Sequence, residues 1–81
     1  MLLIDTVSLM TSDDYADRFK AEYYQLKIRY EKLRDMVDNW DSLDFQPTCN
    51  KGIYRDQLFA MKAYLDILLY RADKENIVLD K

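Results

Sequence analysis

Tyrosines and basic residues alternate within one short stretch of this chain, and together they could bind a nucleotide. The stretch from Glu22 to Leu33 reads EYYQLKIRYEKL and holds three tyrosines, two lysines and one arginine. A tyrosine ring can stack on a base, and a cationic side chain can contact a phosphate. The same stretch also fits a helix that packs its tyrosines and leaves its charged side chains in water. The spacing favours packing for Tyr23 and Tyr30.

A smaller set of residues remains as candidate ligand contacts. Tyr15 stands at the start of the predicted helix, one position before its apolar seam and among three aspartates, so it is free to stack on something other than protein. Arg29 and Lys32 are three residues apart and share a helix face, which suits a small anion. A solvated charged face is the alternative for these two, and for Arg71 the alternative is an ion pair with Glu75.

The residue inventory argues against catalysis. The chain has no histidine, so the usual general base near neutral pH is absent. Cys49 is the only cysteine and has no recognisable activating base, and one glycine cannot form a phosphate-cradling loop. One thiol without histidine also disfavours zinc. The sequence therefore predicts a protein that is not an enzyme and has no metal site and no cofactor.

Size and charge narrow the class of protein further. A chain of 81 residues forms one small domain whose core alone is marginal, and without disulfides or metal, self-association is the remaining source of stability. The net charge of −3 provides no basic surface for long nucleic acid.

The apolar start, MLLIDTVSLM, lacks the basic region of a signal peptide, and no stretch is long enough to span a membrane. We therefore expect a soluble intracellular protein.

Apolar spacing predicts a helical hairpin. A first helix of about 28 residues begins after a cap at Thr11 or Ser12, because apolar residues then alternate in steps of three and four. That seam consists of Ala16, Phe19, Tyr23, Leu26, Tyr30, Leu33, Val37 and Trp40. Pro47 blocks continuation of this helix. A second helix runs from about Ile53 to Lys74 after a cap at Cys49 or Asn50.

The second helix is apolar on more than one side. One seam comprises Tyr54, Leu58, Met61, Leu65, Leu68 and Ala72, and another comprises Ala60, Tyr64 and Ile67. A hairpin covers only one side, so we expect other copies of the chain to cover the rest. The predicted fold class is thus all-α, a long helical hairpin that assembles as a homo-oligomer. The predicted domain bounds are residues 1–11 for an apolar N-terminal arm, 12–76 for the hairpin domain and 77–81 for a C-terminal tail. Each of the two terminal segments could be a frayed end, a strand, or an arm on a neighbouring chain.

Two segments carry a resemblance to a known family, RFKAEYYQLKIRYEKLRDMV and DQLFAMKAYLDILLYRA. They resemble the short helical-hairpin proteins of tailed phages, and the hairpin is similar to that of the anti-CBASS and anti-Thoeris sponges. The matching positions are Arg18, Phe19, Glu22, Leu26, Arg29, Lys32, Leu33, Gln57, Leu58, Ala60, Met61, Tyr64, Ile67, Leu68 and Arg71. The resemblance spans about residues 15–72, and the apolar N-terminal extension is extra.

The resemblance implies a function. Proteins of this kind assemble as hexamers in the cytoplasm of the infected bacterium and sequester cyclic nucleotide messengers (cyclic di- or trinucleotides, or cyclic ADP-ribose isomers) without cleaving them. By position, Tyr15 would stack on a base while Arg29 or Lys32 contacts phosphate between paired chains. Arg71 would belong to a second pocket. The alternative function is a ligand-free helical scaffold or adaptor that binds a host or phage protein through its apolar seams.

Overall fold

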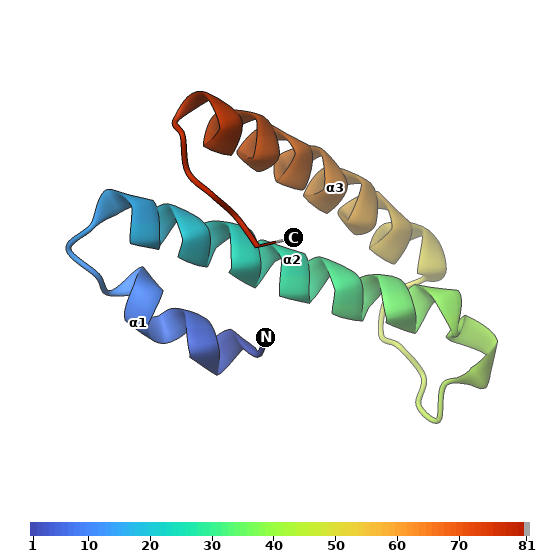
Figure 1. Ribbon diagram of the computed structural model, residues 1–81. Helices are drawn as coiled ribbons and strands as arrows, with labels where there is room; N and C mark the ends of the chain where they lie inside the picture. The colour runs from blue at the N-terminus through green and yellow to red at the C-terminus, as the bar shows by residue number, and fades with distance from the viewer. Residues whose placement is uncertain (81) are drawn as a thin grey trace.

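The computed structural model describes residues 1–80 and is helical throughout its regular elements (Figure 1). A short 3-10 turn, Leu3–Thr6, leads into α1, Val7–Met10. The long helix α2 spans Tyr15–Asp38, a second 3-10 turn spans Trp40–Ser42, and α3 spans Lys51–Lys74. Within these 80 residues no strand occurs. The all-α prediction is therefore confirmed, and the homo-oligomer remains a prediction.

The first long helix begins and ends inside the predicted bounds. Asp14 caps it, since its side chain accepts a hydrogen bond from the Ala16 amide over 3.1 Å. The prediction of Thr11 or Ser12 as the cap was wrong, because Ser12 instead donates its hydroxyl to Asp17 and turns the chain into the helix. The helix has 24 residues rather than about 28. It stops at Asp38 because Trp40–Ser42 tightens into a 3-10 turn.

The second long helix starts where one of the two predicted caps stands. Asn50 accepts a hydrogen bond from the Ile53 amide over 3.0 Å, so Asn50 rather than Cys49 is the cap. The helix ends at Lys74, as predicted. Beyond it Asn76 has a φ of 58°, a left-handed conformation that asparagine tolerates well. This residue reverses the chain, so that the C-terminal segment runs back over α2 (Figure 1).

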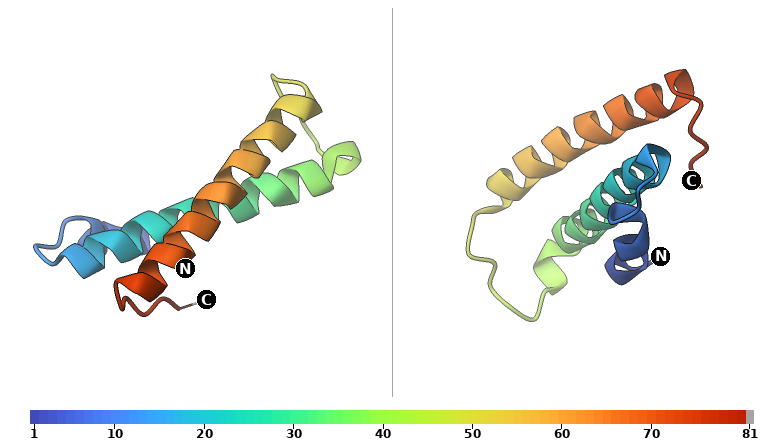
Figure 2. Two further views of the ribbon diagram at one scale, coloured as in Figure 1. Left: turned by 90° about the horizontal axis from the view of Figure 1, so that it is seen from above. Right: turned by 90° about the vertical axis from the view of Figure 1, so that its left-hand side faces the viewer.

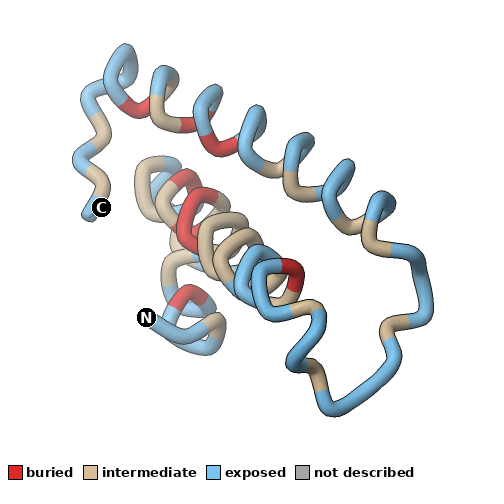
Figure 3. Tube along the Cα trace, turned by 90° about the vertical axis from the view of Figure 1, so that its right-hand side faces the viewer, coloured by how far each residue is buried: buried red, intermediate tan, exposed pale blue. Residues whose placement is uncertain are grey.

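The core lies between the two antiparallel long helices, toward the end of the hairpin away from the connecting loop (Figures 1 and 3). Its buried members are Phe19, Tyr23, Tyr24, Leu65, Leu68 and Ala72. Phe19, Tyr23 and Val37 of the first seam are buried, and the other members are half-buried. The prediction that packing explains Tyr23 is confirmed. At full burial, such side chains stabilise a fold by about 1.5–3 kcal/mol each.

Tyr24 corrects an expectation. Its place off the apolar seam predicts an exposed side chain, but it is only 7% exposed. The C-terminal segment covers it: Ile77 and Leu79 pack against the core, and the Asp80 amide donates a hydrogen bond to the Tyr24 hydroxyl over 2.9 Å. The described part of the predicted tail is thus packed on the hairpin, while Lys81 lies outside the described residues.

The N-terminal arm is also packed on its own chain. Residues 3–10 are helical and lie along α2 on the side away from α3 (Figure 2). Thr6 is fully buried, donates its hydroxyl to the Leu3 carbonyl over 2.7 Å and accepts a hydrogen bond from Gln25 over 2.9 Å. The frayed end and the strand are therefore wrong for this segment, and a contact of the arm with a neighbouring chain remains a prediction.

The two apolar sides of α3 differ in burial. Leu65, Leu68 and Ala72 of the first seam are buried against α2, so Leu65 and Leu68 support the fold of the single chain rather than an interface. Ala60 and Ile67 of the second seam are exposed, as are the neighbouring Phe59 and Tyr70. Tyr64 of the same seam instead reaches Glu22 of α2 with its hydroxyl. The expectation that α3 is apolar on two sides is therefore met, with one side left uncovered within a chain.

Candidate functional site

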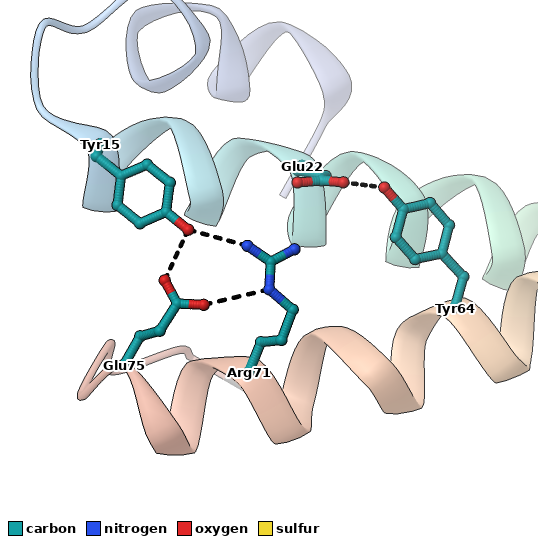
Figure 4. Close-up of polar contacts among 5 residues, drawn as sticks. All are labelled: Tyr15, Glu22, Tyr64, Arg71 and Glu75. Carbon is teal, nitrogen blue, oxygen red and sulfur yellow. Dashed lines mark hydrogen bonds and ion pairs between the residues drawn. The ribbon is translucent and has the colours of Figure 1, made fainter.

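The antiparallel arrangement brings the start of α2 beside the end of α3. Tyr15, the first residue of α2, and Arg71, in the last turn of α3, meet there. The Arg71 Nη2 group donates a hydrogen bond to the Tyr15 hydroxyl over 2.9 Å (Figure 4). The resemblance assigned these two residues to different pockets. The fold brings them together in one place.

Glu75 completes this cluster. The Tyr15 hydroxyl donates to Glu75 Oε1 over 2.6 Å, and Arg71 Nε donates to Glu75 Oε2 over 3.2 Å. The three side chains therefore form a closed triangle of hydrogen bonds (Figure 4), called here the Tyr15 cluster. The predicted ion pair of Arg71 with Glu75 is confirmed.

The aromatic ring of Phe19 packs against the guanidinium of Arg71. The Arg71 guanidinium carbon is 5.0 Å from the centre of the Phe19 ring, a cation–π contact. The Tyr15 ring is tilted by 57° to that of Phe19 with 6.3 Å between centres. Phe19 is almost fully buried, so its ring is held in place by the core and helps to position the Arg71 guanidinium. The cluster is thus a preformed surface feature that combines a phenol ring, a cation and an anion.

Hydrogen bonding shifts the acid–base properties of all three groups. The hydrogen bond from Tyr15, with that from Arg71, lowers the pKa of Glu75. The hydrogen bond to Glu75 raises the pKa of Tyr15, and the one that Arg71 donates to Glu75 raises the pKa of Arg71. At neutral pH the cluster therefore holds a carboxylate, a neutral phenol and a guanidinium cation.

The other two predicted ligand contacts lie elsewhere on the chain. Arg29 lines a shallow groove of about 310 Å³ between the arm and α2, together with Arg18. Lys32 lines a groove of about 490 Å³ beside the C-terminal segment. Arg29 is fourteen residues beyond Tyr15, which is about 21 Å along a helix. Within one chain, neither Arg29 nor Lys32 can share a ligand phosphate with the Tyr15 cluster.

Some contacts in this region were not predicted. Tyr64 donates its hydroxyl to the Glu22 carboxylate, a second link between the long helices (Figure 4). The exposed ion pair of Lys62 with Asp66, both on α3, was also not predicted. Glu75 was considered only as a partner of Arg71, and the signal for its role was the i, i+4 spacing of the two residues. No local signal links Tyr15 to either residue, because that contact depends on how the helices pack.

Two i, i+4 charge pairs that the sequence of α2 allows do not form among the described residues. These are Lys27 with Glu31 and Arg34 with Asp38. Arg34 instead lies 3.9 Å from Asp35 and 5.6 Å from the centre of the Tyr30 ring.

Two further properties concern residues 1–80 only. No group of three or more histidine, cysteine, aspartate or glutamate side chains is placed to hold a metal ion. No helix among them combines the length and apolar character needed to cross a membrane.

The fold and this cluster define a small helical-hairpin protein that carries a preformed aromatic–guanidinium surface site. The chain belongs to the Sequestin family, which matches residues 13–74. The family name fits the sequestering phage proteins that the sequence resembles, so the resemblance is confirmed. Searches of curated proteins and of solved structures found no match. The family match begins after the N-terminal arm, which agrees with the expectation that this extension is extra.

Proposed function

We propose that this protein sequesters a cyclic nucleotide messenger in the cytoplasm of an infected bacterium, without cleaving it, and so weakens the host's defence. Membership of the Sequestin family supports sequestration as the role. The convergence of Tyr15 and Arg71 is the observation that carries the proposal to this ligand class. A cyclic nucleotide offers a flat base and an anionic phosphodiester, and the cluster offers a ring and a guanidinium side by side.

The guanidinium retains binding capacity beyond the cluster. Arginine has five N–H donors, and the contacts within residues 1–80 engage one on Nε and one on Nη2. The Arg71 side chain is 42% exposed. The remaining donors can therefore meet a phosphate oxygen while Tyr15 and Glu75 keep the group oriented. Charge-assisted hydrogen bonds of this kind contribute about 1.5–3 kcal/mol each.

The tyrosine ring retains a free surface as well. Tyr15 is 48% exposed, and its hydroxyl is fixed from two sides by Arg71 and Glu75. A ring held in this way loses little freedom when a base stacks on it, which favours binding. Stacking of a base on an aromatic side chain is worth about 1–3 kcal/mol in proteins that bind single strands.

Arg29 and Lys32 can contact a ligand at the Tyr15 cluster only if they come from a second chain. Because they lie about 21 Å or more along the helix from Tyr15, a phosphate held jointly would need Arg29 or Lys32 from a partner. The resemblance implies such a pairing, within a hexamer. We therefore propose that self-association adds these residues to the site.

Calorimetric titration tests the proposal. The wild type should bind at least one member of a panel of cyclic di- and trinucleotides and cyclic ADP-ribose isomers. Arg71→Ala should weaken this binding about tenfold to a hundredfold. Arg55→Ala, which removes an exposed arginine from the other end of α3, should not. Chromatography of the ligand after denaturation of the complex should recover it intact.

Two results would count against sequestration. Binding of no nucleotide by a folded wild type would favour the scaffold or adaptor function. The exposed Phe59, Ile67 and Tyr70 are the observation that supports that alternative. Recovery of a cleaved ligand would instead identify an enzyme.

A further inference from the structure

The Tyr15 cluster occupies only one edge of the Arg71 guanidinium. A guanidinium is planar and presents its five N–H donors in a fixed fork arrangement. Nε donates to Glu75 Oε2 over 3.2 Å and Nη2 donates to the Tyr15 hydroxyl over 2.9 Å, so the edge formed by these two nitrogens is taken. Nη1 and the second N–H of Nη2 form the other edge, which has no hydrogen-bond partner within residues 1–80 (Figure 4). A phosphate that leaves the cluster intact therefore binds on this second edge.

Glu75 places a fixed negative charge close to that second edge. Both of its carboxylate oxygens accept hydrogen bonds, Oε1 from the Tyr15 hydroxyl over 2.6 Å and Oε2 from Arg71 Nε. The hydrogen bond from Tyr15, together with that from Arg71, lowers the pKa of Glu75, so the group is ionised at neutral pH. Only the width of one guanidinium then separates the carboxylate from a phosphate on the second edge.

The charges within the cluster cancel. Among residues 1–80, Arg71 is the cation that forms an ion pair with Glu75. Lys74, the last residue of α3, instead lies 5.4 Å from the centre of the Tyr70 ring. Because the Tyr15 phenol is neutral, one guanidinium and one carboxylate give the cluster a net charge of 1 − 1 = 0. A phosphate on the second edge is therefore attracted by Arg71 and repelled by Glu75.

The two common forms of phosphate respond differently to such a neutral cluster. A phosphodiester carries one negative charge, whereas a terminal phosphate monoester has a second pKa of about 6 and carries about 1.5 to 2 negative charges at neutral pH. Attraction and repulsion both grow in proportion to the charge of the phosphate. A lone arginine therefore favours the monoester, and a carboxylate fixed beside the arginine removes much of that preference.

We propose that Glu75 is a specificity-determining residue, whose charge lets the Arg71 site accept a phosphodiester while it disfavours a terminal phosphate. The biological consequence of this inference rests on the proposed function. Hydrolysis of a cyclic nucleotide breaks one P–O bond with water and leaves a terminal phosphate and a free hydroxyl. Glu75 therefore disfavours the hydrolysed messenger, and the site remains available for the intact one.

Two small anions test this inference without a base or a nucleotide ring. Dimethyl phosphate is a monoanionic diester, and methyl phosphate is a monoester that is nearly dianionic just above neutral pH. Each is titrated into nitrogen-15-labelled protein at low, constant ionic strength, and the Arg71 Nε–H signal is followed by NMR. The wild type should bind the two anions with similar affinity. Glu75→Gln should shift the ratio of dissociation constants toward methyl phosphate by about threefold or more, the effect of one unit charge at this separation.

The ratio separates a charge effect from a structural one. Glu75→Gln keeps the size of the side chain and one oxygen that can accept from Tyr15, and Glu75 lies at the surface just beyond α3, so the variant should stay folded. If Glu75 only oriented Arg71, its loss would weaken both anions by the same factor. A ratio that Glu75→Gln leaves unchanged would therefore overturn the inference.

Asp73→Asn is the matched control. It removes the same formal charge from the last turn of α3, but Asp73 is exposed and lies outside the cluster, so the ratio should match the wild type. An equal shift in this variant would assign the effect to the overall charge of the chain and overturn the inference.

The outcome for this inference can be told apart from that for the proposed function. An Arg71 signal that responds to neither anion in the wild type would overturn the inference. The expected ratios in a protein that binds no cyclic nucleotide by calorimetry would support the inference and contradict sequestration. Cyclic nucleotide binding with a ratio that Glu75→Gln does not change would give the opposite result.

Discussion

Tyr15 and Arg71 are 56 positions apart in the chain, and a hydrogen bond of 2.9 Å joins them. This contact unites two residues that the sequence resemblance placed in separate pockets. The reason is geometric: antiparallel helices of 24 residues each bring the first residue of α2 beside the last turn of α3. A ligand contact assigned to either residue is therefore expected to depend on the other.

The hydroxyl of Tyr15 provides the first prediction. Tyr15→Phe keeps the ring but removes the hydrogen bonds to Arg71 and Glu75, so stacking should survive while the guanidinium loses one restraint. We expect nucleotide affinity to fall less than in Tyr15→Ala, which also removes the ring. Calorimetry on the two variants measures the difference. Equal losses would show that the ring itself contributes nothing to binding.

The acid–base behaviour of Glu75 provides the second prediction. Its pKa is lowered in the folded protein, so its contribution to stability is present above its unfolded pKa and is lost as pH falls through the folded pKa. The hydrogen bond from Tyr15 is the largest cause. Tyr15→Phe should therefore raise the pKa of Glu75 toward its ordinary value, as measured by carbon NMR of the side-chain carboxyl. Tyr70→Phe, on the outer side of α3, should leave it unchanged.

Adjacent residues on α3 provide the third prediction. Leu68 is fully buried and Ile67 is 58% exposed. Leu68→Ala should lower the free energy of unfolding by about 2–5 kcal/mol, because it leaves a cavity in the core. Ile67→Ala should change the stability of a single chain by less than about 0.5 kcal/mol. Urea unfolding at low protein concentration compares the two, and similar losses would mean that α3 packs differently from the fold described here.

The attachment of the arm provides the fourth prediction. Thr6→Val removes the hydroxyl that donates to Leu3 and accepts from Gln25. Losing the hydrogen bond from the half-buried Gln25 amide should cost about 0.5–1.5 kcal/mol. Hydrogen exchange should then become faster in residues 3–10 without a comparable change in α3. Thr11→Val is the matched control, because Thr11 is exposed and only bonds the Val7 carbonyl within the arm.

The sequence predicted the hairpin well because its signals are local. Apolar spacing, Pro47 and the Asn50 cap act over a few residues and placed both long helices. The start of α2 was misjudged because several residues before it can cap, and only the packed turn selects Asp14. The burial of Tyr24 was missed for another reason. It depends on the C-terminal segment, which has no periodic pattern that would indicate where it packs.

The resemblance added Arg71 as a ligand contact, while the composition and spacing of the sequence determined the all-helical fold, the candidate residues Tyr15, Arg29 and Lys32, and the possible pairing of Arg71 with Glu75. Each follows from residue type or from contacts within about one helical turn. Only the tertiary structure decided that Tyr15 and Arg71 form one cluster and that Arg29 and Lys32 lie apart from it. The packing of α2 against α3 sets these distances, and that packing depends on core residues up to about fifty positions apart, such as Phe19 and Leu68.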